Sequence, residues 1–348
     1  MDIKLIQLLT ETWGPSGNEG QIRNLIESEV RPHVDEVRVD PLGNLIAYKR
    51  AAPEPARGRK GMNSANAAPP KRIMLSAHMD EIGFVITHVD EKGFARFSNV
   101  GGLHTLTLVG NRVLFANGTI GTIQIEKGLR ATNEPPGYDQ MFIDVGATDK
   151  RSSPVKVGDM GALMGALVKL GDRLTGKSLD DRIGCYVVLE TLRQLKHSPH
   201  DVYAVFSVQE EVGLRGARTA AYSVNPDMGL ALDVTLTGDI PEAPFMDVTL
   251  GKGAAIKVQD SSAIADPRVR HLMVKRAEDA HIPYQLEVLT AGGTDTAAIQ
   301  LAREGVPAGC ISIPCRYVHS ISEIVDMNDV QAAIDLLIAV LSNPIDLP

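Results

Sequence analysis

The sequence predicts an α/β fold in which a mixed, mostly parallel sheet is flanked by helices, with a β-rich module inserted into it. Helical and strand-like patterns alternate from about residue 168 onward, which is typical of parallel strands joined by crossover helices. Residues 84–167 instead hold short β-rich runs separated by Gly, Asn and Asp. A chain of 348 residues also has room for one large and one smaller domain.

The N-terminal part combines helical and strand patterns. The expected elements are an amphipathic helix over 1–14, a helix over 22–30, two short strands over 37–49 and a buried strand over 72–80. Residues 51–71 are rich in Pro, Ala, Gly and Asn and have no periodicity, so we expect an exposed flexible loop there.

The β-rich part predicts a small barrel-like module. Its strand-like runs are FVITHV (84–89), ARFSNV (95–100), LTLVGNRVLFA (106–116), TIGTIQI (119–125) and MFIDVGA (141–147). Short strands at this spacing are typical of β-barrels. We therefore assign residues 1–83 and 168–348 to one domain and residues 84–167 to an inserted one.

The second half of the chain supplies the alternation. Strands are expected over 201–209, 228–235, 284–289 and 308–314. Helices are expected over 180–195, 213–224, 267–282, 295–305 and 330–343.

Composition excludes several classes of function. The formal net charge of −8 argues against a nucleic-acid surface, which needs a basic face. No apolar run is long enough to span a membrane, and the N-terminus lacks the pattern of a signal peptide. The chain has three cysteines, Cys185, Cys310 and Cys315, and so small and odd a number does not form a disulfide framework. We therefore expect a cytoplasmic protein.

Polar residues fall where the predicted strands end or a helix begins. They are His78 and Asp80, Asp180 and Asp181, Glu210 and Glu211, Asp233, and His319. Taken singly, each is better explained by a turn, a helix cap or a solvated surface. Taken together they predict one site, because ligands of open α/β sheets gather at the carboxyl ends of strands.

Imidazoles and carboxylates crowded at one edge of a sheet need a cation, and divalent metals such as zinc take this mixture of nitrogen and oxygen donors. A bridging carboxylate would let the set hold two ions. The three negative charges of Asp180, Glu211 and Asp233 nearly cancel the net positive charge of two dications and one bound hydroxide. Glu210 is then left over as a general base for the water.

At these residues the sequence resembles the glutamyl aminopeptidase family of cocatalytic metallopeptidases, which includes the tetrahedral (TET) aminopeptidases. The matching segments are PSGNE (15–19), SAHMDEIGF (76–84), KSLDDRIG (177–184), VQEEVGLRGA (208–217), ALDVT (231–235), GGTDTAAI (292–299) and YVHS (317–320). Some members carry the name cellulase or endoglucanase. Loop 51–71 is longer than the resemblance leads us to expect.

The resemblance implies specific roles. His78 and Asp233 are expected at one metal, Glu211 and His319 at the other, and Asp180 as the bridge. It also implies Glu210 as the general base and Asp80 as the residue that orients His78.

The fold implied by the resemblance is a zinc-peptidase-like α/β domain interrupted by a PDZ-like β module that serves dimerisation and assembly. The implied protein is a homo-oligomer, such as a dodecamer, with two Zn or Co ions in each chain and peptides as substrates. The implied reaction is removal of the N-terminal residue, with a metal-bridging hydroxide as the nucleophile.

Three alternatives stay open. The same metal centre serves deacylases of N-acylated amino acids or peptides. A glucanase needs two carboxyl groups facing each other across a sugar, which the neighbouring residues Glu210 and Glu211 do not obviously provide. A shell-forming scaffold without catalysis would not need the complete donor set.

Overall fold

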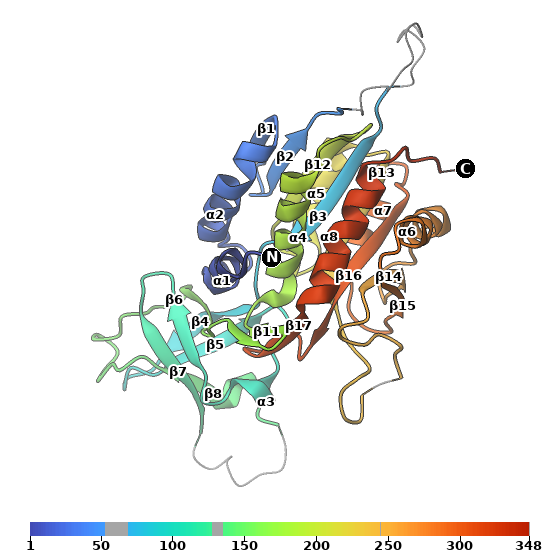
Figure 1. Ribbon diagram of the computed structural model, residues 1–348. Coiled ribbons are helices and arrows are strands. Elements are labelled where there is room, and N and C mark those ends of the chain that lie inside the picture. The colour runs from blue at the N-terminus through green and yellow to red at the C-terminus, as the bar shows by residue number, and fades with distance from the viewer. Residues whose placement is uncertain (53–68, 127–134, 244, 348) are drawn as a thin grey trace, which may run out of the picture.

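The computed structural model describes residues 1–52, 69–126, 135–243 and 245–347, and it consists of a large α/β part with a smaller β-barrel beside it (Figure 1). Most of the predicted loop 51–71 lies outside the described residues, so its flexibility stays a prediction. No helix of the described residues is long and apolar enough to cross a membrane.

The large part is built on an eleven-stranded mixed sheet. Its strands are β1 (Glu36–Val39), β2 (Leu45–Lys49), β3 (Arg72–His78), β10 (Val168–Leu170), β11 (Arg173–Gly176), β12 (Asp201–Ser207), β13 (Met228–Thr235), β14 (Ala254–Gln259), β15 (Tyr284–Val288), β16 (Ala308–Arg316) and β17 (Glu323–Asp326). The main path runs β1-β2-β12-β3-β13-β16-β17-β11-β10, and β14 branches from β16 to pair with β15. The central strands β12, β3, β13 and β16 are parallel to one another. The predicted fold class is therefore confirmed.

Helices cover both faces of the sheet (Figure 1). They are α1 (Ile3–Glu11), α2 (Gly20–Val30), α4 (Leu179–Gln194), α5 (Arg215–Val224), α6 (Pro267–Asp279), α7 (Asp295–Gln300) and α8 (Met327–Leu341). The larger core cluster joins one sheet face to α1, α2, α4, α6 and α8. A smaller cluster joins the other face to α5 and α7.

Strand β3 shows how this packing positions a polar side chain. Successive side chains of a strand point to opposite faces. Ile73, Leu75 and Ala77 belong to the larger core cluster, whereas Met74 belongs to the smaller one. By the same alternation His78 lies on the face covered by α5 and α7, at the carboxyl end of the strand.

The inserted module is a closed antiparallel barrel with strand order β4-β5-β8-β7-β6-β9. Its elements are β4 (Gly83–Val89), β5 (Ala95–Val100), the short helix α3 (Thr105–Leu108), β6 (Arg112–Phe115), β7 (Ile120–Ile125), β8 (Met141–Asp144) and β9 (Met160–Leu163). Phe84 packs edge-on against Phe97 and Phe115 at its centre, and closure leaves no free sheet edge. The barrel confirms the predicted β-rich insertion, while its independence as a domain and its role in assembly stay predictions.

Candidate metal centre

The predicted polar residues meet at one edge of the sheet, where the parallel strands end. His78 is the last residue of β3, and Asp233 lies two residues before the end of β13. Glu210 and Glu211 follow the end of β12, and His319 follows the end of β16. The first turn of α4 brings Asp180 to the same place. The geometry is the one expected of a ligand site in an α/β sheet.

A first donor group consists of His78, Asp180 and Asp233, all buried, with one ligand atom from each within 4.8 Å of the others. The Nε2 atom of His78 is 3.0 Å from Oδ1 of Asp180 and 4.0 Å from Oδ1 of Asp233. The Nδ1 atom of the same ring faces Asp80, so Nε2 is the nitrogen directed at the donors.

A second donor group consists of Asp180, Glu211 and His319, within the same distance limit. The Nε2 atom of His319 is 3.3 Å from Oδ2 of Asp180 and 3.2 Å from Oε2 of Glu211. Asp180 therefore turns one oxygen to each group, which is the arrangement of a bridging carboxylate.

The donors fit divalent metal ions. Oε1 of Glu211 is buried and has no hydrogen-bond partner among the described residues, and a buried orphan carboxylate oxygen is costly unless something positive compensates it. Two imidazoles with three carboxylates form a donor set that zinc or a similar ion accepts.

The pKa values show how strongly this cluster attracts positive charge. Burial alone would lower the pKa of His319, but the carboxylates of Glu211 and Asp180 raise it to about 12. Burial likewise opposes protonation of His78, yet Glu210 and Asp180 raise its pKa well above the usual value. Negative charge therefore dominates the site electrostatically.

Glu210 lies beside the donors but belongs to neither group. Its Oε2 atom is 3.9 Å from Nε2 of His78. Burial raises the pKa of Glu210 well above its usual value; His78 opposes this rise, and the nearby carboxylates of Asp233 and Glu211 add to it. The side chain is thus a carboxylate with increased proton affinity next to the candidate metal positions.

Asp80 connects His78 to the backbone that carries the two glutamates. It is fully buried, and its Oδ1 atom lies 3.5 Å from Nδ1 of His78. The same carboxylate accepts hydrogen bonds from the backbone N–H groups of Glu210 and Glu211 at 3.0 and 3.3 Å. Ser16 donates its hydroxyl to Oδ2 at 2.6 Å.

Asp181 belongs to neither donor group, although it neighbours Asp180. Its two oxygens accept backbone N–H groups instead, from His78 at 3.2 Å and from Gly184 at 3.1 Å. Asp181 therefore fixes the backbone around the first group.

Glu323 is a residue at the site that the sequence does not single out. One of its carboxylate oxygens accepts the backbone N–H of Asp180 at 3.0 Å, and the other accepts that of His319 at 2.9 Å. The one indication in the sequence that Glu323 lies near the site is its position four residues after His319. His104 of the barrel also lies near the second donor group, with its ring centroid 6.3 Å from that of His319.

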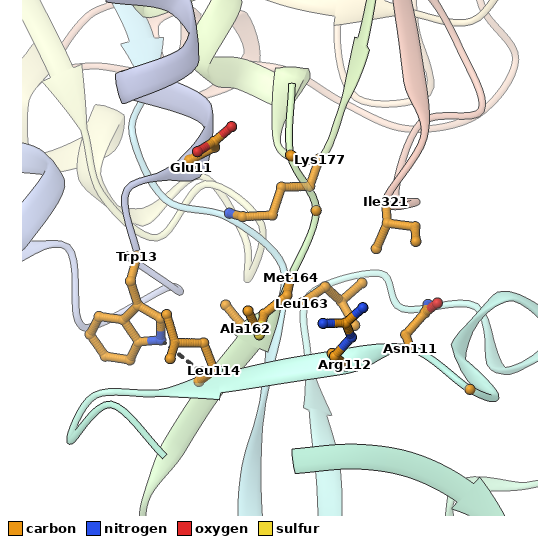
Figure 2. A pocket seen from close by; sticks show the side chains of 13 residues that line it. Glu11, Trp13, Asn111, Arg112, Leu114, Ala162, Leu163, Met164, Lys177 and Ile321 are labelled. Carbon is orange, nitrogen blue, oxygen red and sulfur yellow. Dashed lines mark hydrogen bonds between the residues drawn. The ribbon is translucent and has the colours of Figure 1, made fainter. Parts of the chain in front are cut away.

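A cavity lies near this centre. It has a volume of about 530 Å³ and lies between the end of α1 and strands β6 and β9 of the barrel, with Trp13, Arg112 and Ile321 among its walls (Figure 2). The indole N–H of Trp13 donates to the carbonyl oxygen of Leu114 across one side. None of the donors lines this cavity, but Leu163 and Lys177 line both this cavity and a small hollow that Asp180, Glu211 and His319 line.

The fold and the clustered donors point to the class of α/β metallopeptidases. The family model of the M42 glutamyl aminopeptidases matches residues 61–336. The chain belongs to this family and is a hydrolase of the peptidase class.

Individual relatives agree over the full length of the chain. It is 45% identical over 336 residues to a protein of Acetivibrio thermocellus named as an aminopeptidase, with 96% of each chain covered. It is 33% identical to the lysyl aminopeptidase of Pyrococcus furiosus, with 98% of this chain and 97% of the relative covered.

Two solved structures are similar throughout. An aminopeptidase of the archaeon Desulfurococcus kamchatkensis superposes with a TM-score of 0.89 at 38% identity, over 99% of this chain and 95% of the other. The TET1 peptidase of Pyrococcus horikoshii, described as assembling into a tetrahedron or a large octahedral shell, superposes with a TM-score of 0.83 at 30% identity, over 98% and 99%.

Proposed function

We propose that this protein is an aminopeptidase that uses two divalent metal ions to remove N-terminal residues from peptides. The observation that carries the proposal is the pair of donor groups that share Asp180, with Glu210 free beside them. His78, Asp180 and Asp233 would hold one ion, and Asp180, Glu211 and His319 the other.

Bound at these positions, divalent cations lower the pKa of a coordinated water and polarise a scissile carbonyl group. Glu210 accepts the proton of the attacking water as its oxygen bonds to the carbonyl carbon. Glu210 then gives that proton to the nitrogen of the leaving amine as the carbon–nitrogen bond breaks. Asp80 keeps the His78 ring oriented, with Nε2 toward the donors.

The donor set supports Zn or Co without deciding between them, because availability often selects the ion at such sites. An N-acyl deacylase would use the same centre, and no contact among the described residues favours it. The site does not favour a glucanase, because Oε2 of Glu211 lies 3.2 Å from Nε2 of His319 within a candidate metal donor group.

The assembly proposed from the relatives is a homo-oligomer, such as a dodecameric shell, with the barrel as an assembly module. The support is the similarity to the TET1 peptidase described above. The cytoplasmic location stays a prediction of the sequence.

The test is Glu210→Gln, which keeps the size of the side chain and removes its ability to accept a proton. Hydrolysis of aminoacyl-p-nitroanilides should fall by about 10²- to 10⁴-fold, the usual contribution of a general base. Metal content, measured by mass spectrometry, should stay at two ions per chain.

Glu304→Gln is the matched control, because Glu304 is exposed and belongs to neither donor group. N-acetylated substrates in the same panel separate an aminopeptidase from a deacylase. Near-normal turnover of Glu210→Gln would remove this residue from the proposed role. Failure of the wild type to cleave any free-amine substrate when loaded with metal would overturn the proposed function.

A further inference from the structure

The backbone of two members of the second donor group, Asp180 and His319, is held by one buried carboxylate. Glu323 is 2% exposed and lies at the start of β17, where its neighbours pair with β11 and β16. Its two oxygens accept the N–H groups of Asp180 and His319, one each. One side chain thus joins two ligands that are 139 positions apart in the sequence.

The contact to His319 has a particular importance because this residue has φ +65°, in the left-handed region that disfavours a side chain with a Cβ atom. Such a conformation persists only where surrounding contacts impose it. The hydrogen bond from His319 N–H to Glu323 is one such contact and aims the imidazole at Asp180 and Glu211.

The barrel also contacts side chains of the same group. The turn that follows β5 places Gly102 directly on the ring of His319: a Cβ atom at Gly102 would be 2.5 Å from Nδ1 and 2.7 Å from Cε1. At Gly101, with φ +79°, a Cβ atom would lie 3.3 Å from Oε2 of Glu211. Only residues without side chains let the turn approach this closely.

The first donor group is held differently. His78 is fixed by Asp80 and Asp181, and Asp233 lies inside the parallel ladder between β13 and β16. These contacts all come from the large α/β part of the chain. The two groups therefore differ in what supports them, although they share Asp180.

We propose that Glu323 and Gly102 are positioning residues that set the affinity of the second metal position without touching the metal, so that the barrel forms part of the metal centre. This inference rests on the proposed two-metal site. It assigns the inserted module a role in the chemistry of its own chain, separate from any role in assembly.

The two substitutions that test it act by different routes. Glu323→Gln has one oxygen where the carboxylate has two, so its NH₂ group must face either the N–H of Asp180 or that of His319. Gly102→Ala leaves the hydrogen bonds to Glu323 in place and pushes a methyl group against the His319 ring. Gly20→Ala is the matched control, because the nearest atom to its added Cβ is the flexible Arg23 guanidinium at 3.9 Å.

Metal-stripped protein should be titrated with Zn²⁺ or Co²⁺ by calorimetry, with the ions counted by mass spectrometry. Wild type and Gly20→Ala should show two binding events in each chain. Glu323→Gln and Gly102→Ala should keep the first event and weaken the second by about 10- to 100-fold, the usual effect of losing a residue that orients a ligand. Circular dichroism and size-exclusion chromatography show whether each variant is folded and assembled.

The outcomes distinguish the proposed two-metal function from the proposed positioning role. A wild type that binds fewer than two ions would overturn the proposed two-metal function itself. Suppose that the wild type shows two binding events. The positioning role alone would then be overturned if the variants matched the wild-type affinities within threefold or lost both events equally. If Glu323→Gln does not fold, Gly102→Ala decides the question by the same criteria.

Discussion

Substitution of Asp80 by asparagine tests how much of the metal affinity comes from residues that only orient a ligand. Asp80 is fully buried, and its carboxylate makes four contacts at once: the His78 ring, the backbone N–H groups of Glu210 and Glu211, and the Ser16 hydroxyl. Asparagine keeps the shape, but one oxygen becomes an NH₂ group that cannot accept a hydrogen bond. At least one donor is then left facing another donor, and the negative charge beside the imidazole is lost.

The magnitude follows from these contacts. A buried donor left unsatisfied costs about 1–3 kcal/mol, and loss of a ligand-orienting partner lowers metal affinity by about 10- to 100-fold. Since a factor of ten equals about 1.4 kcal/mol, the two estimates agree. We therefore expect Asp80→Asn to bind the metal ion at the first donor group about 10- to 100-fold more weakly than the wild type.

The assay is competition between metal-stripped protein and a chromophoric chelator of known affinity at constant pH. Asp279→Asn provides the control, because its carboxylate is half exposed at the end of α6, where it pairs with Lys275. A change below about threefold in Asp80→Asn would refute the reasoning, since the four contacts would then contribute nothing to the site.

Further predictions concern stability and metal loading. Lys177→Met removes the buried partner of Glu81 and should lower the free energy of unfolding by about 3–5 kcal/mol in chemical denaturation, with part recovered when Glu81→Gln is added. Burial alone would raise the pKa of Asp239, but hydrogen bonds from the Arg316 guanidinium lower it to about 2, below the unfolded value of 3.8. The stabilisation from this pair, at most about 2 kcal/mol, is therefore complete above pH 4 and lost as pH falls toward 2, and Asp239→Asn should remove this part of the pH dependence of unfolding. Chelation should lower the melting temperature and added Zn²⁺ or Co²⁺ should restore it, because ligands that bind only the native state stabilise it; an unchanged melting temperature would contradict metal binding by the folded chain.

The order of helices and central strands could be predicted because their patterns are long and uniform. All eight residues of β13 are buried, and nearly all of α4 is apolar or buried. The residue types of these segments therefore predict a strand and a helix clearly. Boundaries were less exact. The helix expected over 295–305 ends at Gln300, and that expected over 330–343 begins at Met327, where Asp326 caps it through the N–H of Asn328.

Several short strands were missed for physical reasons. Arg173–Gly176 and Met160–Leu163 are four residues long and contain glycine, which weakens any strand signal. Ala254–Gln259 carries Lys257, which is almost fully buried. The lysine is tolerated because its ammonium group pairs with Glu287 and lies near Asp260, and such tertiary partners are invisible to a local pattern.

The donors could be anticipated because a side chain that binds metal must be of a particular type and must lie at a strand end. Of the supporting residues, the family resemblance indicated Asp80, but it did not indicate Glu323. Glu323 acts on backbone N–H groups, which every residue except proline carries, so nothing in its partners' identities reveals it. Residue type alone also cannot choose between Asp180 and Asp181, whose different roles depend on the directions of their side chains in the first turn of α4.

The place of the insertion ties the barrel closely to the donors. The chain leaves β3 at the donor His78 and enters the barrel at Gly83, with only residues 79–82 between them. Within that short link lie Asp80, which orients the ring, and Glu81, which accepts from the buried ammonium group of Lys177 and the hydroxyl of Ser178. A rigid displacement of the barrel would therefore act on His78 through the link and on His319 through Gly102. Because both imidazoles turn Nε2 toward Asp180, such a displacement would be expected to change the distance between the two donor groups.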